Sequence, residues 1–164
     1  MNIMNPGMSG LWNEYPETAI PLRLLANTLL KKNTIALPPS TREYLASLSA
    51  NLNDCEYCEK MHATISKQIK DDMHDIALFC LPLYKTIIEI VCKNEKGRDV
   101  PNELIQRALE YGATKHDIND VILIGASFCM YSRYVRHTGS QTQTCPIDDG
   151  HYRESAQHIA KHGY

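Results

Sequence analysis

The chain of 164 residues is long enough for one domain, and its 43% hydrophobic and 22% charged residues are ordinary proportions for a globular protein. A net charge of −2, without any long basic run, argues against binding to nucleic acid or to an anionic membrane surface. Because the chain shows neither the cationic-then-apolar pattern of a secretory signal nor the ~20 apolar residues of a membrane span, we expect a single cytoplasmic domain over residues 1–164.

Helical spacing of apolar residues continues through nearly the whole chain, and no strand-like alternation bounded by turns is present. The sequence therefore predicts an all-α protein of six or seven helices, with an irregular N-terminal arm over residues 1–19 and a polar loop over residues 137–149. The expected helices cover residues 20–31, 41–53, 54–69, 83–97, 102–112, 117–135 and 152–162. The longest, residues 117–135, is apolar around much of its circumference, which suits a buried central helix or one packed against another subunit.

Capping and breaking residues set several of these boundaries. Asn53 can end one helix and, with Glu56 three residues on, form a capping box for the next. Thr114 with Asp117 has the same spacing and is expected to cap the longest helix. Pro82 interrupts the apolar stretch before residue 83, so we expect a new helix to begin after it.

Two cysteines and a histidine stand at helical spacing within residues 54–69. Cys55 and Cys58 are three residues apart and His62 follows four residues later, so one helix face carries all three. The helix N-terminus favours a thiolate at Cys55, whereas His62 can accept the proton of Cys58. Two thiols at this spacing can also close a disulfide. The pattern predicts redox chemistry and leaves open which of the two thiols is activated.

With Glu43 twelve residues before Cys55, this set resembles the signature of the alkyl hydroperoxidase D-like proteins of the carboxymuconolactone decarboxylase superfamily. The resemblance covers residues 20–164, including PLYKTIIEIVCKN, VPNELIQRALEYGAT, FCMYSRYV and the final YRESAQHIAKHGY. It implies an all-α, homo-oligomeric bundle of the family's type, assembled as a homotrimer or homohexamer.

The resemblance also implies a catalytic cycle. Cys58 would attack an organic hydroperoxide, and Cys55 would resolve the resulting sulfenic acid as a disulfide. Glu43 and His62 would form the relay that takes up the thiol proton. An external thiol or dithiol would then reduce the disulfide. No metal, haem, flavin or nucleotide cofactor is implied.

The sequence departs from the family pattern at two positions. Tyr57, between the cysteines, stands where some members have histidine, so a possible proton acceptor is absent there. Ser132 stands where an asparagine of an asparagine–arginine pair is expected. Both positions bear on rate and substrate, but neither removes the dithiol.

Other functions remain open for the same residues. A general disulfide oxidoreductase would use the same dithiol, and a lactone decarboxylase would not need Cys55 or Cys58. A structural zinc module would bind through Cys55, Cys58 and His62, although no fourth ligand stands at a matching spacing.

The four remaining cysteines have no such spacing. Cys80, Cys92 and Cys129 fall within apolar helical patterns, and we expect all three to pack as small core residues. Cys145 precedes Pro146 in the polar loop and is expected to be a free, exposed thiol.

Overall fold

The computed structural model describes residues 7–93, 97, 99–138 and 149–164, and these residues form eight α-helices and no strand. The helices are α1 (Gly7–Glu14), α2 (Pro16–Leu30), α3 (Pro39–Leu52), α4 (Glu56–Gln68), α5 (Asp75–Lys93), α6 (Asn102–Glu110), α7 (Lys115–His137) and α8 (Asp149–His162). The all-α class is confirmed. Within the described ranges, no helix combines the length and the apolar character that crossing a bilayer requires.

The N-terminal arm is not irregular where the structure describes it. Helix α1 lies within it, and α2 begins at Pro16 rather than at residue 20. Proline at the first helical position lacks only an N–H that would have no intrahelical partner, so Pro16 favours this start. The predicted count of six or seven helices was therefore too low.

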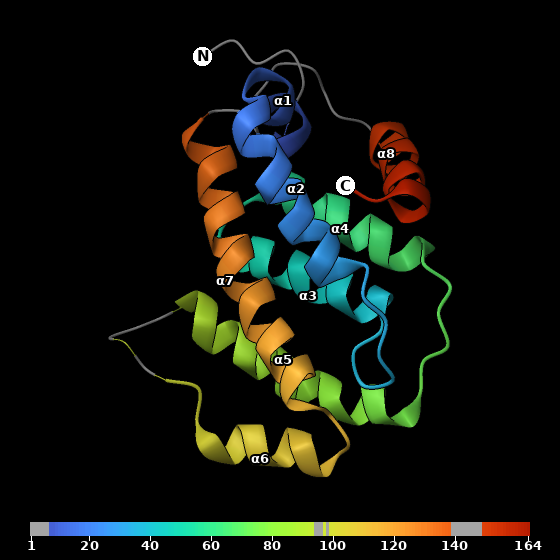
Figure 1. Ribbon diagram of the computed structural model, residues 1–164, viewed down its shortest axis with the longest axis vertical. Helices are drawn as coiled ribbons and strands as arrows, with labels where there is room; N and C mark the ends of the chain where they lie inside the picture. The colour runs from blue at the N-terminus through green and yellow to red at the C-terminus, as the bar shows by residue number, and fades with distance from the viewer. Residues whose placement is uncertain (1–6, 94–96, 98, 139–148) are drawn as a thin grey trace.

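Helix α3 is the centre of the bundle and packs against α4, α5 and α7 (Figure 1). Its inward residues Leu45, Ala46 and Ala50 are completely buried. Helix α7 crosses the molecule as its longest helix and buries Val121, Ile124 and other apolar residues along most of its length. The prediction of a buried central helix at 117–135 is confirmed only in part: α7 extends beyond it at both ends and buries one side, but Leu123 and Met130 are 39% and 44% exposed, and α3 is the central helix.

Pro82 lies inside α5 and does not divide it. A proline within a helix leaves the carbonyl of the residue four positions earlier, here Leu78, without its helical donor. Leu78 is 51% exposed, so water can satisfy that carbonyl. Helix α5 consequently begins eight residues earlier than predicted, at Asp75, and ends at Lys93; residues 94–96 lie outside the described part.

The two predicted capping boxes have different outcomes. Thr114 and Asp117 form theirs: the Thr114 hydroxyl accepts the Asp117 N–H at 3.1 Å, and the Asp117 carboxylate accepts the Thr114 N–H at 2.8 Å. The box of Asn53 and Glu56 does not form, because the Asn53 amide donates to Ser49 O at 2.8 Å and Asn53 is the C-cap of α3. Helix α4 begins at Glu56, with Cys55 as its N-cap.

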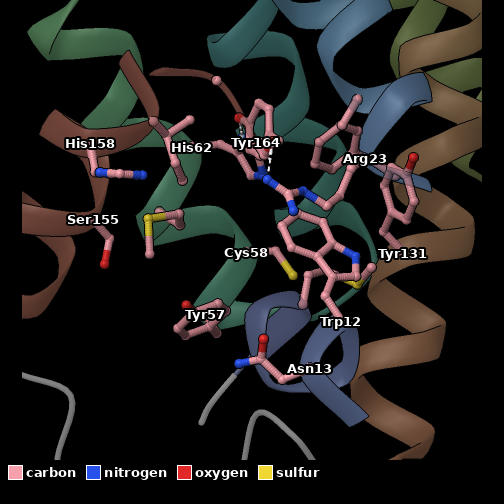
Figure 2. A pocket seen from close by; sticks show the side chains of 16 residues that line it. Trp12, Asn13, Arg23, Tyr57, Cys58, His62, Tyr131, Ser155, His158 and Tyr164 are labelled. Carbon is pink, nitrogen blue, oxygen red and sulfur yellow. Dashed lines mark hydrogen bonds between the residues drawn. The ribbon is translucent and has the colours of Figure 1, made fainter. Parts of the chain in front are cut away.

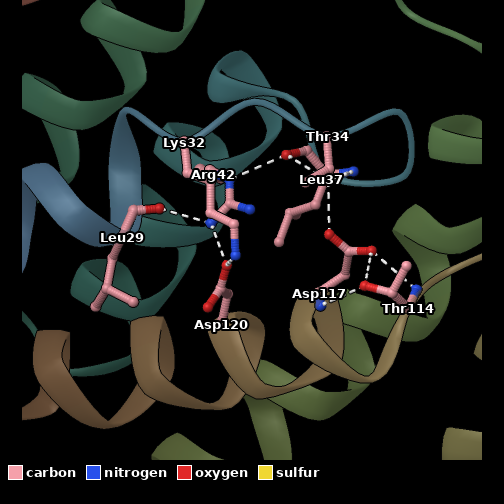
Figure 3. Close-up of polar contacts among 8 residues, drawn as sticks. All are labelled: Leu29, Lys32, Thr34, Leu37, Arg42, Thr114, Asp117 and Asp120. Atoms are coloured by element: carbon pink, nitrogen blue, oxygen red, sulfur yellow. Dashed lines mark hydrogen bonds and ion pairs between the residues drawn. The ribbon is translucent and has the colours of Figure 1, made fainter.

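A buried ion pair fixes the beginning of α3 (Figure 3). Arg42 is completely buried and donates to Leu37 O at 2.9 Å, to Leu29 O at 2.7 Å and to Asp120 Oδ2 at 3.0 Å. These bonds join α3 to the end of α2 and to α7. Because Glu43 follows Arg42 directly, the same bonds fix the backbone that carries the predicted relay carboxylate.

Candidate active site

Cys55 and Cys58 lie at the beginning of α4, as the N-cap and the third helical residue. Both are free thiols, and Cys55 is completely buried whereas Cys58 is 5% exposed. The α3–α4 turn brings them into the core: the Cys55 N–H donates to Ala50 O at 3.0 Å, and Asp54 takes a positive φ of 54°. The predicted shared helix face is therefore present, with Cys55 at the edge of the helix rather than inside its first turn.

The two thiols differ in their pKa values. A hydrogen bond from Cys58 lowers the pKa of Cys55 against the opposing effect of burial, and the Ser132 hydroxyl and the Arg136 charge lower it further. The same hydrogen bond, together with burial, raises the pKa of Cys58. In the reduced dithiol the negative charge is thus best placed on Cys55 and the proton on Cys58.

The predicted relay residues Glu43 and His62 are in direct contact. His62 Nδ1 lies 2.8 Å from Glu43 Oε2, and Glu43 is completely buried. The edge-to-face contact of the His62 ring with Phe128, at 4.6 Å between centroids, fixes the ring plane. If the Nδ1–H group of His62 donates this hydrogen bond to the Glu43 carboxylate, then Nε2 is the ring nitrogen that can accept a proton.

A third residue, Tyr164, belongs to this relay and was not predicted. Its hydroxyl lies 2.9 and 2.8 Å from the two Glu43 oxygens and 3.0 Å from His62 Nδ1. Burial, and then the charge of Glu43, raise the pKa of Tyr164 well above its usual value. The hydroxyl therefore stays protonated and donates to the carboxylate.

Residues of α2 hold Tyr164 in place. Its carbonyl oxygen accepts from Arg23 at 2.7 Å and from Asn27 at 3.3 Å, and its N–H donates to Asn27 Oδ1 at 2.9 Å. The preceding Gly163 has φ of 86°, and a Cβ there would lie 2.6 Å from Asn27 Oδ1. Arg23 and Asn27 precede Tyr164 by 141 and 137 positions, and together they hold its hydroxyl in place. No local sequence signal indicates this contact.

A cavity of about 350 Å³ opens onto Cys58 and His62 (Figure 2). Its wall is largely aromatic and apolar, and Asn13, Arg23, Ser155 and His158 are among its polar members. Cys58 lines it and Cys55 does not. The lining residues are Met8, Trp12, Asn13, Arg23, Ala26, Tyr57, Cys58, Met61, His62, Phe128, Tyr131, Ser155, His158, Ile159, Gly163 and Tyr164.

The structure brings the predicted site residues together as two neighbouring units. Cys55 with Cys58 forms one unit, and Glu43 with His62 forms the other, extended by Tyr164. No hydrogen bond among the described residues joins His62 to either thiol, but His62 and Cys58 face the same cavity. A water molecule or the substrate in that cavity can therefore connect them.

The other cysteines only partly follow the prediction. Cys80 is completely buried, as predicted, whereas Cys92 and Cys129 are half-buried and lie next to each other. Cys145 lies outside the described residues. In the part of the chain that the structure describes, no group of three or more histidine, cysteine or carboxylate residues is arranged to hold a metal ion.

Comparison with known proteins identifies no relative: no protein family, curated protein or solved structure matches this chain. The resemblance to the alkyl hydroperoxidase D-like proteins therefore stays a prediction from the sequence.

Proposed function

We propose that the protein is a thiol-dependent peroxidase that reduces organic hydroperoxides through a Cys55–Cys58 dithiol and disulfide cycle. One observation carries this proposal: Cys58 and His62 line the same cavity, and His62 is hydrogen-bonded to the buried carboxylate of Glu43. A nucleophile beside a base that a third group orients is the general arrangement for activating a thiol. The proposal agrees with the alkyl hydroperoxidase D-like resemblance.

In the first step, His62 Nε2 accepts the proton of Cys58, directly or through water, while Glu43 stabilises the imidazolium. The Cys58 thiolate then attacks the distal oxygen of the hydroperoxide ROOH. An S–O bond forms, the O–O bond breaks, and the proton returns from His62 to the departing alkoxide. The products are the alcohol ROH and a sulfenic acid at Cys58.

In the second step, the sulfur of Cys55 attacks the sulfenic acid and water leaves. The lowered pKa of Cys55 suits this role, because a thiolate is the attacking species. The product disulfide holds two electrons fewer than the dithiol, and an external thiol or dithiol supplies them by exchange. The order of attack follows access: Cys55 has the lower pKa, but only Cys58 lines the cavity.

The cavity wall supports an organic rather than an inorganic peroxide as substrate. Trp12, Tyr57 and Phe128 present apolar area that an alkyl or aryl group can cover, at about 25 cal/mol per Å² of apolar surface buried. Hydrogen peroxide has no such group. We therefore expect a substrate with a bulky apolar group to react faster than hydrogen peroxide.

A general disulfide oxidoreductase is the second candidate, and the lowered pKa of Cys55 favours it. A thiol of low pKa is a good leaving group, so a disulfide at Cys55 and Cys58 would be easily reduced by exchange. This enzyme would use the same residues but would show little preference for peroxides.

One experiment distinguishes the two candidate functions by comparing two oxidants. Fully reduced protein is mixed with cumene hydroperoxide or with glutathione disulfide, and formation of the Cys55–Cys58 disulfide is followed by peptide mass spectrometry. The peroxidase predicts faster oxidation by the hydroperoxide, with loss of the reaction in Cys58→Ser and slowing in His62→Gln. Faster oxidation by glutathione disulfide in the wild type, unaffected by His62→Gln, would instead support the oxidoreductase.

A further inference from the structure

A second pair of cysteines lies where α5 and α7 approach each other closely. Gly125 of α7 makes this approach possible, because a Cβ there would lie only 3.0 Å from Val91 Cγ1 and 3.3 Å from Ile88 Cδ1 on α5. A disulfide requires Cα atoms about 4.4–6.8 Å apart, so between two helices it can form only where their backbones pass close to each other. The glycine contact therefore shows that α5 and α7 approach each other closely in this part of their interface.

Cys92 and Cys129 occupy that part of the interface. Cys92 Sγ lies 3.9 Å from the carbonyl oxygen of Gly125, which is one helical turn before Cys129 on α7. Each thiol has the largest influence on the pKa of the other, so the two side chains are neighbours. Asn53 at the end of α3 donates its amide to Cys129 Sγ at 3.3 Å. The two thiols are thus neighbours, and the Cys129 sulfur also accepts a hydrogen bond from Asn53.

These neighbours make Cys129 the more acidic thiol of the pair. The neighbouring Cys92 thiol is the largest cause that lowers the pKa of Cys129, although burial opposes this shift. The hydrogen bond from Asn53 and the charge of Arg133 also lower it, and the resulting pKa is about 6. The neighbouring Cys129 thiol and burial raise the pKa of Cys92. Cys129 is therefore largely a thiolate at neutral pH, with a protonated thiol beside it.

Access distinguishes this pair from the cysteines of the candidate active site. Cys92 and Cys129 are both half-buried, whereas Cys55 is completely buried and Cys58 is 5% exposed. Neither Cys92 nor Cys129 lines the 350 Å³ cavity. A reagent from solution can thus reach this pair without entering the cavity.

We propose that Cys92 and Cys129 form a second redox-active thiol pair, which exchanges with small-molecule disulfides. In this reaction the Cys129 thiolate attacks a disulfide RSSR, an S–S bond forms to Cys129, and RS⁻ leaves. Cys92 then attacks the Cys129 sulfur of this mixed disulfide, its proton passes to solvent or to the leaving thiolate, and the second RS⁻ leaves. The pair is oxidised by two electrons and RSSR is reduced to two thiols.

Residues of α7 and of the turn after α3 connect the two cysteine pairs. Ser132, whose hydroxyl lowers the pKa of Cys55, follows Cys129 by three residues on this helix. Asn53, which donates to Cys129, precedes Cys55 by two residues and accepts a hydrogen bond from Arg136 at 3.1 Å. The second pair nevertheless has its own nucleophile, partner and access, so the inference does not depend on the proposed peroxidase function.

The test uses the full chain with Cys55→Ser and Cys58→Ser, which removes the first pair. Reduced protein is incubated with glutathione disulfide at pH 7, quenched with acid, alkylated and analysed by peptide mass spectrometry. We expect a glutathione adduct at Cys129 that is replaced by a Cys92–Cys129 disulfide. Cys80, which is completely buried, is the internal reference and should stay reduced. A stable adduct at Cys129 with Cys92 still free, or no reaction at either thiol, would overturn the proposal.

Two further variants identify the roles. Adding Cys92→Ser should leave the Cys129 adduct in place, and adding Cys129→Ser should abolish the adduct and the disulfide together. Equal reaction of Cys92 in the Cys129→Ser variant would contradict the assignment of Cys129 as nucleophile. Because serine substitutions can disturb folding, the same digest of the unsubstituted chain is a second measurement: it should contain the Cys92–Cys129 linkage, and its absence there would also overturn the proposal.

Discussion

At the scale of single residues, the hydroxyl of Tyr164 completes the proposed relay. It is the donor to both oxygens of the buried Glu43 carboxylate, and it also contacts His62 Nδ1. A buried carboxylate without donors is costly, and hydrogen bonds to charged groups contribute about 1.5–3 kcal/mol each. Tyr164 therefore satisfies the buried oxygens of Glu43 and helps to orient His62, which is a positioning role.

Replacing Tyr164 with phenylalanine tests this role. We expect Tyr164→Phe to slow single-turnover oxidation of Cys58 by cumene hydroperoxide about tenfold or more, the effect of losing about 1.4 kcal/mol of stabilisation of the charged relay. Stopped-flow rate constants at several peroxide concentrations measure the loss, which should fall on the maximal rate and not on the half-saturating concentration.

Tyr131→Phe is the matched control. Tyr131 also lines the cavity, but its hydroxyl donates to Leu22 O at 3.0 Å and has no contact with Glu43 or His62. This variant should retain nearly the full maximal rate. Equal losses in the two variants would show that the cavity shape, and not the relay contact, determines the rate.

At the scale of elements, the Arg42–Asp120 ion pair joins α3 to α7. Removing one partner of a buried pair leaves an uncompensated charge and typically costs about 3–5 kcal/mol. We expect Asp120→Asn to lower the free energy of unfolding by about this amount, because the Arg42 guanidinium is completely buried. Urea unfolding followed by circular dichroism measures it.

Lys32 provides the comparison, since it also contacts Asp120 Oδ2, at 2.9 Å, but its side chain is 43% exposed. An exposed pair contributes about 0–1 kcal/mol, so Lys32→Ala should change stability little. If Lys32→Ala costs as much as Asp120→Asn, then the buried position of Arg42 is not what gives the pair its importance.

The cap of α7 is predicted to make stability depend on pH. Burial alone would raise the pKa of Asp117, but hydrogen bonds from Thr114 and Thr34 outweigh it and lower the pKa. A lowered folded-state pKa means that this stability is complete above the unfolded value, near 3.9, and is lost as the pH falls through the folded value. We expect Thr114→Ala to cost about 1 kcal/mol at pH 7 and less at pH 3.

Urea unfolding at the two pH values checks this prediction, with Thr86→Ala as the control. Thr86 lies on the exposed side of α5, and its hydroxyl donates only to Pro82 O within its own helix. Its cost should be small and independent of pH. An equal cost of Thr114→Ala at pH 7 and pH 3 would contradict the account of the cap.

Local signals explain which parts of the fold were predictable. The Thr114–Asp117 box, the end of α3 at Asn53 and the helix face of Cys55 and Cys58 depend on residues within a few positions of each other. The wrong predictions depended on tertiary context: Pro82 is tolerated because its turn is exposed, and Asn53 turns toward Ser49 and Cys129 instead of capping α4. The same limit explains why Tyr164, which comes 121 positions after Glu43, was missed.

At the scale of the whole molecule, the fold brings distant segments together around Cys58, the proposed nucleophile. Glu43 comes from α3, the thiols and His62 from α4, and Tyr164 from beyond α8, while α1 and α2 provide Trp12 and Arg23 of the cavity wall. A Cβ on Gly7 would overlap the ring of Tyr57, so α1 packs directly against a residue that lies between the two cysteines. The cavity is therefore a product of the complete bundle.

Exposed apolar side chains support the proposed homo-oligomer. Leu78 and Phe79 are 51% and 60% exposed on α5, and Tyr111 packs beside Phe79 with ring centroids 5.9 Å apart. We expect a homotrimer or homohexamer in sedimentation-velocity measurements, and Phe79→Asp should shift it toward smaller species. A monomer at all concentrations would contradict this part of the proposal, whereas Thr86→Asp, an exposed polar position on the same helix, should leave the assembly unchanged.

The central claim is that Cys58, and not the more acidic Cys55, attacks the hydroperoxide. The most direct measurement traps the sulfenic acid with dimedone in Cys55→Ser and in Cys58→Ser, after mixing each reduced variant with one equivalent of cumene hydroperoxide, and locates the adduct by peptide mass spectrometry. We expect rapid labelling of Cys58 in Cys55→Ser and no labelling of Cys55 in Cys58→Ser. Labelling of Cys55 at a comparable rate, or of neither thiol, would contradict it.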